Sequence, residues 1–258
     1  MLRRHAISLL IGSVARFLDP RQGCALLLDM KTRELLATNG SAQAGKILLP
    51  PGSALKPFTL AALEAAGKLP RDAEFVCPEH LTLAGRRMDC SHPRMVAPLR
   101  IDTALAYSCN CFVAHEAARF APGELARALR PFGFSVQAAS GERQQLQALG
   151  EDSVLITPEG LVRAYRQLAL QAADPILAGL EGAVEFGTGQ LARVNWAKLA
   201  GKTGSARMGG QFVAWFAGFV PSRAPRVAVV VALSGKHGGS DAAPVAAEIL
   251  NAWHEGKL

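Results

Sequence analysis

Apolar and polar positions recur with two different periods along the chain. Near the start, residues 23–38 form two apolar runs joined by a polar turn at 29–34, which predicts a β-hairpin. Three further strand-like runs follow Trp196, with turn residues between them: 198–207, 212–220 and 226–233. These five runs predict the strands of one sheet whose members come from distant parts of the sequence.

The middle of the chain has a helical period. From Ser53 to Lys68, Ala and Leu recur with helical spacing, and Gly67 closes the pattern. Helical patterns continue over 99–134 and 157–171, and a last helix is predicted over 242–254. Strands at both ends of a helical centre predict an α+β fold: an antiparallel five-stranded sheet flanked by helices, with an all-helical lobe inserted over roughly residues 58–190.

Length and charge limit what this chain does. Its 258 residues, 50% of them apolar, suit one well-packed domain, which we place at 20–258. With 28 basic and 21 acidic residues the net charge is +7, which favours anionic neighbours such as wall polymers or lipid headgroups. The basic residues are scattered, and neither a zinc-finger spacing nor an aromatic-rich basic motif occurs, so we expect no nucleic-acid partner.

The first 19 residues stand apart from the predicted domain. Arg3 and Arg4 precede an apolar stretch over 6–15, which resembles a short signal peptide and indicates export to the cell envelope. The alternative is an amphipathic first helix packed on the domain, because the stretch is short and Gly12 interrupts it. This stretch is too short to span a bilayer, and no later run approaches the roughly 18 apolar residues needed, so no transmembrane anchor is expected.

The five cysteines do not form a familiar pattern. Cys77 and Cys90 bracket a turn-rich segment; they either close a loop as a disulfide in an oxidising compartment or serve as two small apolar residues. Cys109 and Cys111 are two positions apart, which places their thiols on alternate sides of a strand or too close together on a helix for a structural zinc site. We therefore expect no metal, and nothing in the chain calls for a cofactor.

Ser53 and Lys56 are the first candidate chemical pair. A spacing of three on a helix puts both side chains on one face, within reach of each other. Pro57 requires the helix to begin close to Ser53, because proline is tolerated only among the first, unpaired N–H donors. A serine at such a terminus lies near converging backbone N–H groups, and a neutral lysine is able to accept its proton.

Two further strings carry polar groups in apolar or strand-like surroundings. Ser108-Cys109-Asn110 has apolar neighbours on both sides, so its polar side chains need partners or a cavity. Lys202-Thr203-Gly204-Ser205 lies in a predicted strand, whose glycines allow a ligand's backbone to approach closely.

In this order, the three strings resemble the penicillin-binding protein transpeptidase domain, whose relatives include the serine β-lactamases and β-lactam sensors. Other segments resemble the same family and extend the similarity from about Gly23 to Trp253; they are Ile156-Thr157-Pro158, Phe186-Gly187-Thr188-Gly189, residues 213–219 and Asp241-Ala242-Ala243-Pro244. The resemblance implies an active site between the sheet and the helical lobe.

The resemblance also implies catalytic roles. Lys56 would take the proton of Ser53, Ser53 would attack a D-alanyl-D-alanine stem peptide of peptidoglycan, and Ser108 would relay the proton to the leaving amine. β-Lactam antibiotics would bind covalently as mimics of the donor. A glycosyltransferase or another wall-synthesis protein is the implied protein partner.

Substrate binding falls, by the same resemblance, to the other polar residues of the strings. Asn110 would hold the substrate amide, Lys202 would steer a carboxylate, and Thr203 would offer a hydroxyl beside Gly204. Ser205 would add a second hydroxyl, and its backbone N–H would complete an oxyanion hole with that of Ser53. The family more often has threonine at the position of Ser205; serine keeps the hydroxyl.

Alternatives of the same fold stay open. A carboxypeptidase would release the acyl group to water, as would a β-lactamase, but the latter needs a dedicated base. No Glu-x-x-Leu-Asn stretch occurs between the second and third strings, and the second ends in Asn110 rather than in the valine of a Ser-x-Val pattern. A non-enzymatic β-lactam sensor or scaffold is the remaining class; a sensor would normally carry a transmembrane part, and a scaffold would usually have lost a motif residue.

Overall fold

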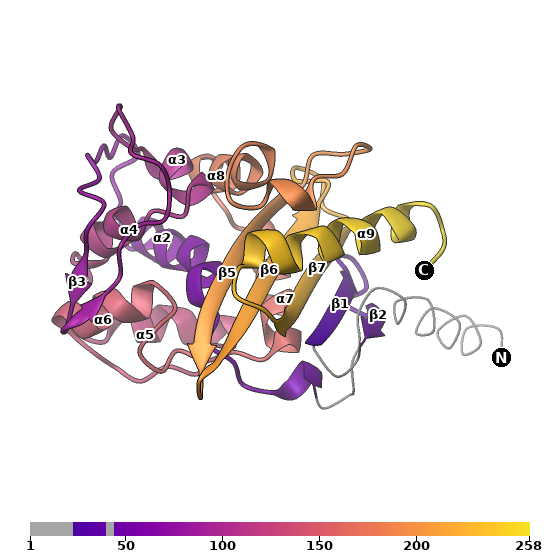
Figure 1. The fold of residues 1–258 in the computed structure, drawn as a ribbon, viewed down its shortest axis with the longest axis horizontal. Coiled ribbons are helices and arrows are strands. Elements are labelled where there is room, and N and C mark those ends of the chain that lie inside the picture. Colours follow the sequence, from indigo (N-terminus) through magenta and orange to yellow (C-terminus); the bar gives the residue numbers. More distant parts are fainter. Residues whose placement is uncertain (1–22, 40–43) are drawn as a thin grey trace.

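A computed structural model of the protein describes residues 23–39 and 44–258. The segment that resembles a signal peptide lies outside these residues. A twisted sheet occupies the centre of the molecule, and a lobe made largely of helices lies beside it, to the left in Figure 1.

The sheet has five strands in the spatial order β2-β1-β7-β6-β5, and every neighbouring pair is antiparallel. The strands are β1 (Gly23–Asp29), β2 (Leu35–Asn39), β5 (Ala200–Met208), β6 (Gln211–Val220) and β7 (Val227–Ser234). The predicted hairpin and the predicted five-stranded sheet are confirmed. Strand β5, which carries Lys202 to Ser205, is an edge strand and so has one side free of sheet partners.

Both faces of the sheet are covered by helices, because consecutive residues of its central strands are apolar and so point apolar side chains to both faces. On β7, Val227, Val229 and Val231 pack in one cluster with α9 (Ala243–His254). The intervening Ala228 and Val230 pack in a second cluster with α7 (Pro158–Ala169) and the helical lobe. A strand buried on both faces reads as a continuous apolar run rather than as an alternation.

The helical lobe is built around Phe58. This side chain is fully buried and meets the rings of Phe132, Phe134 and Tyr165 edge to face, with centroids 5.1–5.3 Å away. The lobe's helices are η2 (Gly52–Leu55), α2 (Lys56–Ala65), α3 (Ile101–Ala106), α4 (Asn110–Ala117), α5 (Glu124–Leu129), η3 (Arg130–Phe132) and α6 (Gly141–Ala148). A further helix, α8 (Asp174–Glu185), packs between the lobe and the sheet, against α3 and β5. Short turns η1 (Ala44–Lys46), η4 (Gln190–Ala192) and η5 (Gly238–Ala242) complete the fold.

The sequence predicted an all-helical lobe, but the lobe also contains strands. It contains a hairpin of two short strands, β3 (Thr82–Leu83) and β4 (Arg86–Arg87), at the far left of Figure 1. Ala84 and Gly85 both adopt positive φ and form its tight turn. This hairpin lies within a long irregular excursion that leaves and returns at the bridge between Phe75 and Leu99.

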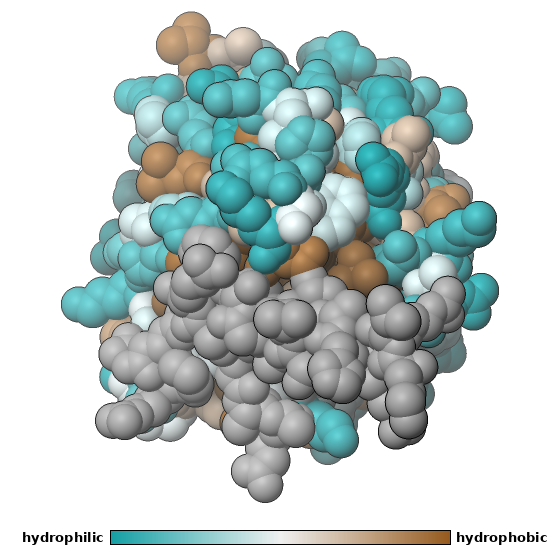
Figure 2. Space-filling model, turned by 90° about the vertical axis from the view of Figure 1, so that its right-hand side faces the viewer, coloured by the Kyte–Doolittle hydropathy of each residue, from teal (hydrophilic) through white to brown (hydrophobic). Residues whose placement is uncertain are grey.

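The side of the molecule that bears β2 and the C-terminal end of α9 is shown in Figure 2. Where described residues form this surface, most of the side chains are hydrophilic, as expected for a face in contact with water. Among the helices of the described residues, none has the length and apolar content needed to cross a membrane.

Candidate active site

Ser53 lies in the 3-10 turn η2, directly before helix α2 begins at Lys56. Pro57 falls in the first turn of α2, as its missing N–H requires, so the first string opens a helix as predicted. Two buried side chains fix this turn from outside it. The Tyr165 hydroxyl donates to the Ala54 carbonyl at 2.9 Å, and the Trp215 indole N–H donates to the Pro50 carbonyl at 2.9 Å. The backbone around Ser53 is therefore held from both the helical lobe and the sheet.

Lys56 is fully buried, and its amine is directed at the second string. Nζ donates to the Ser108 carbonyl at 2.6 Å, to the Ser108 hydroxyl at 3.1 Å and to Asn110 Oδ1. Burial lowers the pKa of Lys56 from 10.5 to about 8. An amine with such a pKa exists in both protonation states near neutral pH, as a proton acceptor must.

The second string sits at a left-handed bend before α4. Ser108 has φ of +58°, a conformation that costs a non-glycine residue energy and is often found at functional sites. The bend turns Ser108 toward Lys56 and starts the helix at Asn110. The Asn110 amide donates to the carbonyls of Met88 at 2.9 Å and Asp89 at 3.1 Å, so it also anchors the irregular excursion over the cleft.

The third string occupies β5, facing Ser53. The Thr203 hydroxyl lies 2.7 Å from that of Thr188, and Ser205 Oγ accepts a hydrogen bond from the Gly238 N–H at 3.1 Å. Lys202 is fully buried, and burial together with the positive charge of Lys56 holds its pKa well below the usual range. Both lysines thus lie beneath the surface that carries the hydroxyl groups.

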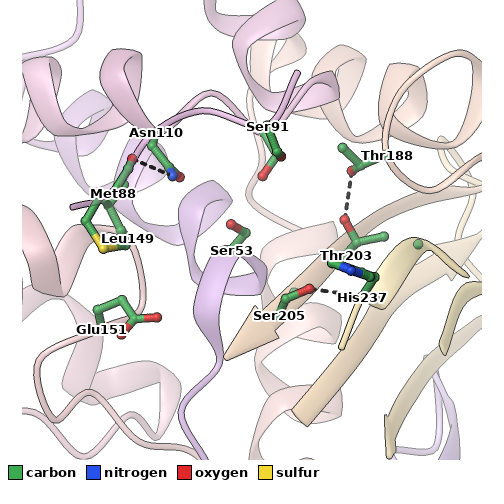
Figure 3. A pocket seen from close by; sticks show the side chains of 14 residues that line it. Ser53, Met88, Ser91, Asn110, Leu149, Glu151, Thr188, Thr203, Ser205 and His237 are labelled. Atoms are coloured by element: carbon green, nitrogen blue, oxygen red, sulfur yellow. Dashed lines mark hydrogen bonds between the residues drawn. The ribbon is translucent and has the colours of Figure 1, made fainter. Parts of the chain in front are cut away.

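These residues surround a cleft of about 420 Å³ between the lobe and the sheet. In Figure 3, Ser53 lies centrally, with Asn110 and Glu151 on one side and Thr203 and Ser205 on the other. Six of the eight residues predicted from the sequence line the cleft: Ser53, Ser108, Asn110, Thr203, Gly204 and Ser205. Lys56 and Lys202 are not in the lining, because they are buried behind it.

The cleft has further lining residues that the sequence had not singled out as site residues: Met88, Ser91, Leu149, Glu151, Thr188, His237, Gly238 and Gly239. Thr188 belongs to a segment already noted for its family resemblance, and the polar string at 237–239 follows a predicted strand. Glu151 pairs with Arg86 of the β3–β4 hairpin, at 2.6 Å. Nothing local marks Met88, Ser91 or Leu149, which depend on tertiary folding.

Three backbone segments meet at Ser53 with no room between them. Gly52 has φ of +51°, and a Cβ there would lie 2.4 Å from the Ser205 carbonyl oxygen. A Cβ on Gly150 would lie 2.0 Å from the Gly52 carbonyl oxygen. Only glycine permits such close approach. The contacts fix the turn of Ser53 directly against β5, where an oxyanion hole would need the N–H groups of Ser53 and Ser205.

The disulfide considered for Cys77 and Cys90 is not formed. Their sulfurs are 3.6 Å apart, far beyond the roughly 2.05 Å of an S–S bond, and both are free thiols. Both side chains pack, partly buried, against the apolar core, as the alternative of two small apolar residues requires, and other thiols lie equally close to them.

The family model for the penicillin binding protein transpeptidase domain matches residues 23–251, nearly the whole described chain. The chain belongs to this family. The match confirms the resemblance inferred from the three strings. No curated protein sequence matches the chain.

Solved structures of transpeptidase domains have the same fold. The D,D-transpeptidase domain of a peptidoglycan glycosyltransferase from Eggerthella lenta superposes with a TM-score of 0.80 at 19% identity, covering 97% of this chain and 82% of that one. A peptidoglycan glycosyltransferase from Burkholderia ambifaria gives 0.80 at 20% identity, covering 98% and 94%. The transpeptidase domain of penicillin-binding protein 3 from Burkholderia pseudomallei gives 0.79 at 19% identity, covering 97% and 92%.

Proposed function

We propose that this chain is a penicillin-binding DD-transpeptidase that acts on D-alanyl-D-alanine stem peptides of peptidoglycan through an acyl-enzyme on Ser53. One observation carries the proposal. Ser53 lies in a cleft between Ser108 and Asn110 on one side and Thr203 to Ser205 on the other, with the buried amine of Lys56 bonded beneath them. A serine nucleophile, a base of lowered pKa and a strand edge are the parts that acyl transfer from a peptide requires.

In the acylation step, neutral Lys56 accepts the Ser53 proton, and Ser53 Oγ attacks the carbonyl carbon of the penultimate D-alanine. The oxyanion that forms accepts hydrogen bonds from the backbone N–H groups of Ser53 and Ser205, which the contact of Gly52 with β5 supports. When the peptide bond breaks, Ser108 passes a proton from Lys56 to the departing amine of D-alanine, along the hydrogen bond that joins their side chains.

In the second step, an acceptor amine attacks the acyl-enzyme and forms the cross-link, giving up a proton to neutral Lys56 through Ser108. Lys56 then returns this proton to Ser53 Oγ as the ester bond breaks. Attack by water at this stage would give a carboxypeptidase. Glu151 is the acidic side chain of the cleft lining, and its ion pair with Arg86 supports a structural role rather than that of a base which activates water.

Substrate recognition is proposed to use the free edge of β5. An extended peptide would add to this edge through backbone hydrogen bonds, with the hydroxyls of Thr203 and Ser205 beside it. Because Lys202 is fully buried, its effect on a substrate carboxylate would act through the cleft's electrostatic potential. A cell-envelope location and a partner that presents glycan strands complete the proposal.

Labelling with a fluorescent penicillin tests the nucleophile. The wild-type chain should form a covalent adduct on the peptide that contains Ser53, whereas Ser53→Ala should form none. Ser135→Ala, which changes an exposed serine outside the cleft lining, should label as the wild type does. Adduct formation on Ser53→Ala would overturn the assignment. An adduct that lasts minutes to hours, with cross-linked product from stem pentapeptide, would support transpeptidation; adduct turnover within seconds would refute it in favour of a β-lactamase.

A further inference from the structure

Three thiols and an imidazole converge beside the second string, and one of the thiols, that of Cys109, belongs to the string. The Sγ atoms of Cys77, Cys90 and Cys109 form a closed triangle with edges of 3.6, 3.7 and 3.5 Å. Nε2 of His92 lies 3.6 Å from Cys77 Sγ, and all four ligand atoms are within 4.8 Å of one another. They come from three separate parts of the chain.

These separations match tetrahedral zinc coordination. With Zn–S bonds of about 2.3 Å and Zn–N bonds of about 2.0–2.1 Å, a regular tetrahedron places two sulfurs about 3.8 Å apart and a sulfur and a nitrogen about 3.6 Å apart. The observed edges are within about 0.3 Å of these values. The spacing of Cys109 and Cys111 alone predicts no metal, whereas the fold brings other ligands to Cys109.

The tautomer of His92 suits a ligand. Its Nδ1 lies 2.8 Å from the carbonyl oxygen of Pro93, a contact in which only Nδ1–H can donate. The proton on Nδ1 leaves Nε2 with a free lone pair, and Nε2 is the atom that faces the thiols. A backbone carbonyl that fixes the far nitrogen in this way is the usual support of a metal-bound histidine.

Cys109 also lies at the N-terminus of a helix. It is the N-cap of α4, and its Sγ accepts a hydrogen bond from the Phe112 N–H at 3.3 Å. The positive end of a helix stabilises negative charge on sulfur. Three thiolates and a neutral imidazole around Zn²⁺ are one of the standard structural sets of zinc ligands.

Little regular structure holds the irregular excursion between Phe75 and Leu99, although Leu83 is buried and Arg86 pairs with Glu151. Its regular structure is the two-residue pair β3 and β4, and Val76 and Val96 are 73% and 105% exposed rather than packed. A segment with so little regular structure gains order from a metal that links it to the domain.

We propose that Cys77, Cys90, His92 and Cys109 bind one structural zinc ion. The ion joins the excursion to the N-terminus of α4. Cys111 lies 3.5 Å from Cys90, but its sulfur is directed at the His80 carbonyl and is not a ligand. Because Cys109 stands between Ser108 and Asn110, and Cys90 follows the two carbonyls that Asn110 bonds, the ion fixes both ends of that contact.

Metal analysis of the purified chain tests the site independently of catalysis. The protein, prepared without chelator and under reducing conditions, should contain one zinc per chain by mass spectrometry, and so should Ser53→Ala. Cys90→Ser and His92→Ala should each lower zinc affinity by more than about 100-fold, since even outer contacts of a metal site contribute 10- to 100-fold. Cys24→Ala, which changes a buried cysteine of β1, and Cys111→Ala should retain zinc.

Several results would overturn the site. These are a wild-type chain that takes up no zinc after incubation with zinc chloride, a Cys90→Ser variant with wild-type zinc content, or iron with labile sulfide in place of zinc. Loss of zinc in Cys111→Ala with retention in His92→Ala would refute His92 as the fourth ligand. If the variants do not fold, titration of the metal-free wild-type chain with Co²⁺ decides. The absorption bands of tetrahedral Co²⁺ bound to thiolates would support the site, and their absence would refute it.

Discussion

The acylation rate of Ser53 should follow the protonation of Lys56. Burial lowers the pKa of this amine from 10.5 to about 8, and only its neutral form accepts the Ser53 proton. Below pH 8 the rate should therefore rise with pH, and above pH 9 it should be constant. A lysine exposed to water would instead give a rate that rises through pH 10.

The size of the change follows from the pKa. With a pKa of about 8 the neutral fraction is about 1% at pH 6, about 10% at pH 7 and about 50% at pH 8, so the rate should rise about 50-fold from pH 6 to pH 8. The shift of Lys56 corresponds to about 3 kcal/mol. Since the folded chain binds fewer protons at Lys56 than the unfolded chain between about pH 8 and 10.5, this group makes the free energy of unfolding rise with pH in that window.

Stopped-flow measurement of penicillin acylation between pH 6 and pH 10 is the assay. Lys56→Arg should abolish acylation at every pH, because a guanidinium does not lose its proton. Lys198→Arg, which changes a half-exposed lysine paired with Glu181, should keep the wild-type profile. A rate independent of pH between 6 and 8, or an inflection near 10, would refute Lys56 as the base.

Two further predictions concern the support of the nucleophile. Gly150→Ala should destabilise the fold by more than about 4 kcal/mol and slow acylation, because its Cβ would lie 2.0 Å from the Gly52 carbonyl oxygen. Gly133 has a similar φ, +90°, but a Cβ there would meet no other atom, so Gly133→Ala should cost only the left-handed strain of about 1–2 kcal/mol. An equal loss of unfolding free energy in the two variants would contradict the steric argument. Tyr165→Phe should cost about 1–3 kcal/mol in urea denaturation by leaving the buried Ala54 carbonyl without its donor, and no measurable loss would argue against that bond.

Most of the fold could be predicted because its strands and longer helices carry their period in the sequence. The apolar runs of β6 and β7, and the helical patterns of α7 and α9, placed these elements to within a few residues. Helix α8 was not predicted by itself: it contains glycines and Pro175, and its packing between the lobe and the sheet outweighs its weak propensity. The β3–β4 hairpin is too short to show a period at all.

The candidate site was predictable where its reactive residues are close together in the sequence. Ser53 and Lys56 are three residues apart on one helical turn, and Thr203 to Ser205 are contiguous on one strand. The thiol cluster was not predictable in this way, since Cys77, Cys90 and Cys109 are brought together by an irregular excursion with no pattern of its own. Metal sites are recognised in a sequence by ligands a few residues apart, and by that criterion only pairs such as Cys109 and Cys111 are considered together.

The glycine contacts at Gly52 and Gly150 have a consequence for inhibitor design. Because the Ser205 carbonyl oxygen lies against Gly52, moving the lobe away from the sheet at Ser53 would break this backbone contact. We therefore expect ligands of different bulk to be accommodated by rotation of lining side chains such as His237 and Met88. Inhibitors with the same reactive group should therefore differ in affinity mainly through substituents that reach these lining side chains. Their reactive group should meet the same backbone around Ser53 in each complex.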